Sequence, residues 1–244
     1  MNEKKNKVTN RKHLLYIGLC FSVLIVSYEV GQAGFYVIPV VRDSASTTTC
    51  ANDGYEVLSD TGQCWMAFNL GATQVATSID DEAAYGDLYQ WGRRGDGHER
   101  RDLDSATETT STQSATDNPG HGFFITGNKW RSPRNDFLWQ GISGINNPCP
   151  QGFRLPTEAE WQAEINQYGT TATALFNSSL KLIEASFRYY TNGTLYAWSE
   201  GAYWSSTVDG DNNNYAFYLY FRDNGAFMNS NYRTYGFSVR CIKD

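Results

Sequence analysis

Asp209, Asp211 and Asn213 have the spacing at which a calcium-binding loop places its first three oxygen ligands. Such a loop also needs a glycine at its sixth position and a bidentate carboxylate at its twelfth. This chain has Asn214 and Tyr220 at those positions. Because too few acidic ligands remain, we expect no metal here, and no other motif in the chain indicates a cofactor.

The segment that follows has the pattern of a strand with two different faces. Apolar and polar positions alternate from Tyr215 to Arg222, which predicts a β-strand. The face expected to be buried carries Phe217, Leu219 and Phe221, and the face expected to meet solvent carries Tyr218, Tyr220 and Arg222. The dipeptide Asn224-Gly225 then predicts a tight hairpin turn. The alternative is that these tyrosines pack beneath a neighbouring loop.

This combination of residues favours a recognition surface. Tyrosine offers a large contact area with few rotatable bonds, while Asn, Ser and Gly adapt their hydrogen bonds, as in antibody loops. We therefore predict noncovalent binding of a protein or glycan by the turn 209–214, the outward strand face and the loop 229–234. The residues expected to contact the ligand are Asp209, Asp211, Asn212, Asn213, Asn214, Tyr218, Tyr220, Arg222, Asn229, Asn231 and Tyr232.

The residues available for catalysis are few. Beyond the N-terminal segment only His98 and His121 remain, and the chain has no HExxH, GxSxG, phosphate-loop or CxxC motif. The sequence therefore predicts a protein that is not an enzyme.

The N-terminus has the pattern of an export signal. A basic stretch precedes the apolar run from Leu14 to Val30, and the small residues Gly31 and Ala33 follow. We predict a signal peptide over residues 1–33, an extended leader over 34–49 and one domain over 50–244. The alternative is an uncleaved membrane anchor over residues 14–41, with Glu29 as a costly polar group within it. Either arrangement predicts a secreted or cell-surface protein.

Charge and cysteine content agree with an extracellular role. Residues 1–33 hold five of the 20 basic residues and two of the 26 acidic ones, which leaves 15 against 24. Nucleic acid is a poor partner for such an acidic protein. The remaining cysteines are an even set in an oxidising compartment, which favours disulfides, although spacing alone leaves three pairings open; they are Cys50, Cys64, Cys149 and Cys241.

Local signals predict a hairpin and a helix. The turn-forming residues 59–62 separate two short strands between Cys50 and Asn69, and a Cys50–Cys64 bond would staple that hairpin. Thr157 and Glu160 form a capping box, and Gly169 ends the helix that they begin. Trp161 would fix this helix to the core, with Trp204 and Phe237 as further scaffold.

Four blocks of the sequence resemble the signature blocks of a known family. They are YGDLYQWGR at 85–93, PCPQGFRLPTEAEWQ at 148–162, YWSST at 203–207 and GFSVRCIKD at 236–244. In this order they resemble the Fibrobacter succinogenes major paralogous domain family, which is related to the formylglycine-generating sulfatase-modifying domain. The resemblance covers roughly residues 50–244.

The resemblance implies an α+β, C-type-lectin-like fold, in which a twisted antiparallel sheet carries one or two helices and long irregular loops. It also implies a disulfide between Cys149 and Cys241. The related enzymes oxidise a substrate cysteine with reactive cysteines near the C-terminus. Here the late cysteine is Cys241, so a formylglycine-generating oxidase is the alternative to a binding protein, and a structural cell-surface component is a third.

A second resemblance concerns the segment between the last two blocks. Proteins diversified by retroelements often end in this fold, with a variable segment between blocks like YWSST and GFSVRC. Their mutagenesis replaces adenines, so Asn codons are frequent starting points, and this segment carries Asn at 212, 213, 214, 224, 229 and 231. The alternative is an ordinary set of Asn-rich loops.

Overall fold

The computed structural model describes residues 50–51, 53–101, 108–196, 199–212 and 214–244. Of residues 1–49 it describes only two short paired strands, β1 (Gly18–Leu19) and β2 (Ser22–Val23). Apart from these four residues, the predicted signal peptide or anchor and the leader lie outside the described residues, as does Asn213. Within the described ranges, no helix combines the length and the hydrophobicity that a membrane crossing requires.

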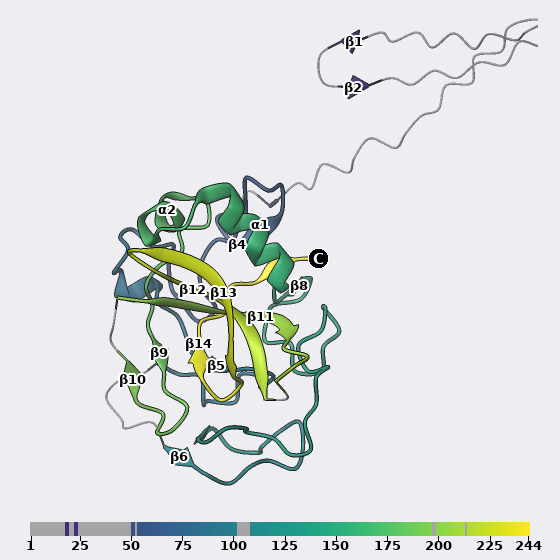
Figure 1. The fold of residues 1–244 in the computed structure, drawn as a ribbon, viewed down its shortest axis with the longest axis vertical. Helices are drawn as coiled ribbons and strands as arrows, with labels where there is room; N and C mark the ends of the chain where they lie inside the picture. Colours follow the sequence, from purple (N-terminus) through teal and green to yellow (C-terminus); the bar gives the residue numbers. More distant parts are fainter. Residues whose placement is uncertain are drawn as a thin grey trace, which may run out of the picture. The chain divides into compact units, whose positions relative to one another are not determined.

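The fold is mixed, with mostly antiparallel strands in several small sheets and two helices, which agrees with the α+β expectation (Figure 1). One sheet has the order β10-β9-β14-β5, a second has the order β3-β4-β15-β8, and β6 pairs with β7 in parallel. The bounds of these strands are β3 Glu56–Leu58, β4 Cys64–Met66, β5 Tyr89–Gln90, β6 Thr109–Thr110, β7 Phe124–Ile125, β8 Phe153–Arg154, β9 Phe187–Arg188, β10 Leu195–Tyr196, β14 Gly236–Phe237 and β15 Ile242–Lys243.

The predicted helix is present as α1, Glu158–Tyr168. Thr157 accepts a hydrogen bond from the Glu160 amide, and the Glu160 side chain accepts one from the Thr157 amide, so the capping box is confirmed. Gly169 closes the helix, as predicted. A short second helix, α2, spans Ala172–Asn177, and a single 3-10 turn, η1, spans Glu82–Ala84.

The longest strands form a three-stranded sheet of β11 (Gly201–Val208), β12 (Tyr215–Arg222) and β13 (Gly225–Tyr232). The hairpin between β12 and β13 is confirmed, but its turn lies one residue earlier than predicted. Arg222 pairs with Gly225, so Asp223 and Asn224 occupy the turn. The segment 229–232 is therefore the end of a strand, and the loop predicted there is wrong.

Each face of this sheet is partly covered, as Figure 1 shows with α1 and α2 on one side and β14 and β5 on the other. Leu219 and Phe221 pack with Trp161 of α1, as the alternation predicts. On the opposite face Tyr218 packs with Trp204 and Phe237 and is only 5% exposed. The expectation that Tyr218 faces solvent is therefore wrong, because Phe237 of a second sheet packs on the part of the face that carries it.

Two disulfides and a set of buried tryptophans fix this arrangement. Cys50 is bonded to Cys64 and Cys149 to Cys241, which confirms the pairing that the resemblance implies. Indole N–H groups join distant segments: Trp204 donates to the carbonyl of Tyr89 at 2.7 Å and Trp161 to that of Trp204 at 3.1 Å. Residues of the sequence blocks 85–93, 148–162 and 203–207 thus meet in one core. Disulfides of this kind suggest an oxidising environment.

Candidate binding surface

Aromatic rings from two hairpins form a network at one side of the molecule. In the β9–β10 hairpin, Tyr196 stacks on Phe187 with ring centres 5.5 Å apart, and Tyr189 contacts Tyr190 at 5.1 Å. Tyr190 then meets Tyr232 of β13 at 4.8 Å. The two hairpins, which have β11 between them in sequence, therefore share one aromatic layer.

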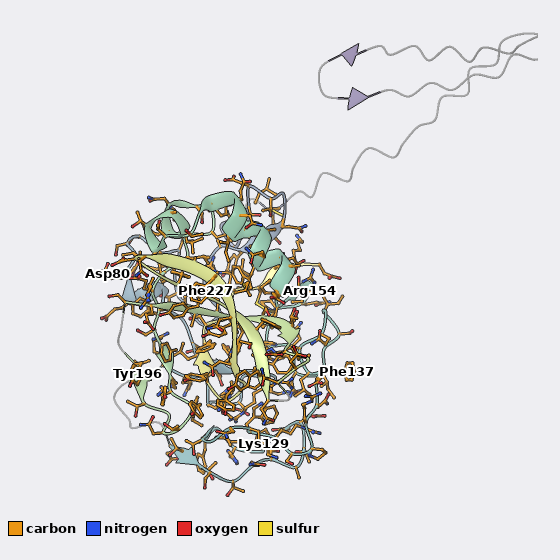
Figure 2. The ribbon with its side chains drawn as sticks, viewed as in Figure 1. Asp80, Lys129, Phe137, Arg154, Tyr196 and Phe227 are labelled. Carbon is orange, nitrogen blue, oxygen red and sulfur yellow. A yellow bond between two sulfur atoms is a disulfide. The ribbon has the colours of Figure 1, made fainter. Side chains whose placement is uncertain are left out.

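We call the partly exposed members of this network the aromatic surface; they are Phe187, Tyr189, Tyr190, Tyr196, Tyr215, Tyr220, Phe227 and Tyr232. Figure 2 labels Tyr196 on β10 and Phe227 on β13, which are 38% and 47% exposed. Beneath them lie the buried rings of Tyr218, Tyr235 and Phe237. Exposed aromatic groups on a rigid layer of packed rings are typical of recognition sites, since little side-chain entropy is lost on binding.

Polar groups accompany the rings at the edge strand. Asn229 pairs in register with Tyr218, and its amide reaches the Tyr218 hydroxyl at 3.4 Å. Burial raises the pKa of Tyr218, and burial together with the carboxylate of Glu200 raises that of Tyr220. Both hydroxyls therefore keep their protons at neutral pH. This part of the surface offers hydroxyl and amide groups beside apolar rings.

Asp209 does not belong to this surface. It is buried, and its carboxylate accepts hydrogen bonds from the amides of Asp211 and Asn212 and from the Ser230 hydroxyl. Burial alone would raise the pKa of Asp209, but the bonds from Ser230 and Asn212 outweigh it and hold the pKa below its ordinary value. Asp209 therefore orders the turn between β11 and β12 and is not presented to a ligand in this conformation.

The other predicted site residues fall into separate groups. Asn229 and Asn231 lie on the same face of β13 as each other, opposite to the face that carries Ser230. Asp211 and Asn212 are exposed in the β11–β12 turn, and Arg222 is exposed beside the next turn. Asn214 lines a hollow described below. None of the described asparagines of this segment is buried; they are Asn212, Asn214, Asn224, Asn229 and Asn231.

The sequence interpretation missed the contribution of the β9–β10 hairpin. Phe187, Tyr189, Tyr190 and Tyr196 flank Asn192-Gly193, which is a hairpin signal with aromatic residues on both sides. That local pattern predicts a hairpin. It does not predict that the hairpin packs against Tyr232, because this contact depends on how β9 pairs with β14.

A buried polar network around Arg93 has the residue types of a site. The ligand atoms of Asp96, His98 and Glu99 lie within 4.8 Å of one another, as in a metal site. Each has a protein partner: His98 Nε2 accepts from the Gln90 amide at 3.0 Å, so its ring proton is on Nδ1 and is donated to Asp96 at 2.6 Å. Glu99 accepts from the amides of Asp96 and Gly97. The network therefore orders the loop that follows β5.

A second trio of potential ligand atoms in the described residues consists of Cys50, Glu56 and Cys64. The two sulfurs are bonded to each other, and Glu56 pairs with Lys243 at 2.8 Å. Sulfurs in a disulfide are not thiolates, which metal ligation requires. These three residues therefore form the disulfide and the ion pair that stabilise the β3–β4 hairpin.

The Asp96 carboxylate should make the fold sensitive to acid. Burial alone would raise the pKa of Asp96, but the hydrogen bond from His98 and the charge of Arg93 lower it to about 2. Because the folded-state pKa lies below the unfolded value of about 3.9, the stabilisation is present above about pH 4 and is lost as the pH falls towards 2. Its size is about 2 kcal/mol. Urea unfolding at pH 7, 4 and 2.5 should show a smaller acid-induced loss for Asp96→Asn than for the wild type. Parallel pH profiles would contradict this role.

Fold and surface together define a class: a disulfide-bonded protein of mixed α and β structure that presents aromatic side chains from two hairpins. Residues 177–242 match a family model described as Domain of unknown function (DUF8237). The matched span begins at the last residue of α2 and ends in β15, so it contains both hairpins. No curated protein and no solved structure matches the chain.

Proposed function

We propose that this chain is an exported, C-type-lectin-like protein that binds a protein or glycan ligand through the aromatic surface. The export pattern of residues 1–33 and the two disulfides support a location outside the cytoplasm. The contact between Tyr190 and Tyr232 carries the proposal, because it unites the exposed rings of two hairpins into one surface.

Binding would be noncovalent contact with a prepared surface. The rings already pack on Tyr235 and Phe237, so a ligand would gain apolar contact without first ordering them. Asn229, Asn231 and the tyrosine hydroxyls would supply hydrogen bonds. This combination suits a sugar, whose faces are apolar and whose rims are polar, and equally a protein loop.

A triple variant tests the proposal. Tyr190→Ala, Tyr220→Ala and Tyr232→Ala together remove partly exposed rings and leave Tyr218 in place, because that ring belongs to the core. Labelled full-length protein should be applied to a glycan array and to intact cells. Where the wild type binds, the triple variant should bind at least about tenfold more weakly, since aromatic hot-spot residues are worth about 2 kcal/mol each.

The matched control is Phe137→Ala, which removes an aromatic ring that is 77% exposed and lies outside the aromatic surface (Figure 2). This control should bind as the wild type does. Equal binding by the triple variant and the wild type would refute the proposed surface. A wild type that binds neither panel would favour the structural cell-surface component.

A further inference from the structure

Four cationic side chains gather around a hollow next to the β12–β13 hairpin. The hollow, about 290 Å³ including space open to solvent, is lined by Lys129, Arg131, Arg134 and Arg233, with Trp91 and Asn214 among the other lining residues. We call it the cationic hollow. Arg233 follows β13 and Asn214 precedes β12, and the Arg233 amide donates to the Asn214 carbonyl at 2.9 Å. The hairpin base therefore holds one wall of the hollow in place.

The carboxylates around the hollow do not balance its cations. Arg131 pairs with Asp117 at 2.6 Å, while Asp136 is shared between Arg134 at 2.9 Å and Arg233 at 2.8 Å. Lys129 makes no ion pair or hydrogen bond with another described residue. In these ion pairs two carboxylates serve three of the four cations, in a chain whose formal net charge is −6. The local charge is opposite in sign to that of the whole protein.

Arg233 is the rigid element of this site. Its side chain is 8% exposed, its guanidinium lies 4.5 Å from the centre of the Trp91 ring, and its Nε donates to the Tyr215 carbonyl. Its Nη2 has no hydrogen-bond partner among the described residues. Burial lowers the pKa of Arg233, yet an arginine stays charged at neutral pH. Arg233 shares its ion-pair partner Asp136 with Arg134, and Asp209 acts on it only through its charge, so the positive charge of Arg233 is incompletely compensated.

We propose that the cationic hollow binds the oxyanion group of a ligand, a carboxylate, sulfate or phosphate. Lysine and arginine side chains are the usual partners of such groups, and an anion in the hollow would offset the buried charge of Arg233. The hollow is open to solvent, so a small acidic group of a ligand can approach its cations. The acidic protein as a whole repels polyanions, which disfavours nucleic acid.

The hollow borders the aromatic surface, because Asn214 and Arg233 are the chain neighbours of Tyr215 and Tyr232. A ligand lying on the aromatic surface could therefore place an acidic group in the hollow. The oxyanion site does not depend on that arrangement, since its charges and its walls exist without the exposed rings.

The test is an NMR titration of the full, 15N-labelled chain with sodium sulfate, sodium phosphate and sodium glucuronate, at constant ionic strength. Amide signals of residues 129–132, 134 and 135 and the side-chain N–H signal of Arg233 should shift in a saturable manner with at least one probe. The probe that binds most tightly distinguishes a sulfate, a phosphate and a carboxylate ligand. The double variant Lys129→Ala, Arg134→Ala should bind at least about fivefold more weakly, the loss expected for one exposed charge contact.

Two comparisons keep this proposal falsifiable. Arg100→Ala removes an exposed cation outside the hollow and should bind the probe as the wild type does. The triple variant of the aromatic surface should also keep oxyanion binding, so failure of one site is distinguishable from failure of the other. Shifts that do not saturate with any probe, or a loss in Arg100→Ala equal to that in the double variant, would overturn the oxyanion site.

Discussion

Replacing Cys149 and Cys241 together by Ala is expected to lower the free energy of unfolding by about 4.5 kcal/mol, against about 3 kcal/mol for Cys50 and Cys64. The first bond closes a separation of 92 residues and the second one of 14. Constraining a longer loop removes more conformational entropy from the unfolded chain. Cys241 is also fully buried, so the loss of its sulfur adds a packing cost. Urea denaturation of the two double variants and the wild type measures both effects.

The wild type with both disulfides reduced provides the control. Its free energy of unfolding should be no larger than that of the less stable double variant. Equal losses in the two variants would contradict the dependence on loop length. Thiol counting by mass spectrometry on the unreduced wild type should find Cys50, Cys64, Cys149 and Cys241 all protected. A reduced thiol at Cys241 or Cys149 would instead favour the oxidase alternative.

Replacing Arg93 by Ala should cost about 3 to 5 kcal/mol of stability, as is usual when one partner of a buried ion pair is removed. Arg93 is fully buried and donates to the Gln90 side chain, to the carbonyls of Phe123 and His121, and to Asp96. Its removal would leave the partly buried Asp96 carboxylate without its cation and the Phe123 and His121 carbonyls without this donor.

The neighbouring Arg94 provides a matched control, because it is exposed and donates mainly to the Ile145 carbonyl. Arg94→Ala should cost less than about 1 kcal/mol. Arg93→Lys should not restore stability, since an ammonium group cannot reproduce the planar set of donors. Similar unfolding midpoints for Arg93→Ala and Arg94→Ala in urea would show that the network is dispensable.

The parts of the fold that the sequence predicts are those set by neighbours along the chain. Thr157 and Glu160 are three residues apart, so their capping box is readable without knowledge of the fold. The hairpin after Arg222 is equally local, although a turn dipeptide does not fix its register, and the turn lies one residue earlier than predicted. The small sheets depend on pairings such as β14 with β5 and β9, which local patterns do not reveal.

The predictions for the candidate site divide in the same way, into features set by local sequence and features set by distant contacts. Alternation along β12 separates Leu219 from Tyr218 correctly, but it cannot say whether the second face is covered. Tyrosine is common both on exposed faces and in partly polar interiors, so the residue type alone does not predict whether Tyr218 is exposed or buried. The sequence predicts Asp209 as a ligand contact, yet its carboxylate accepts a hydrogen bond from the hydroxyl of the distant Ser230. Arg233 gave no local signal, because its role arises from Trp91 and Asp136.

The Cys149–Cys241 bond also determines how the molecule would behave under tension. Tyr232 lies about 9 residues before Cys241 but about 83 residues after Cys149. A force applied between Tyr232 and the part of the chain before Cys149 is carried by residues 232–241 and the disulfide. At roughly 3.5 Å per residue, the loaded path can lengthen to about 30 Å, whereas the unbridged path could reach about 290 Å. A pull on the aromatic surface at Tyr232 would thus load a short covalent tether before it could unravel the domain.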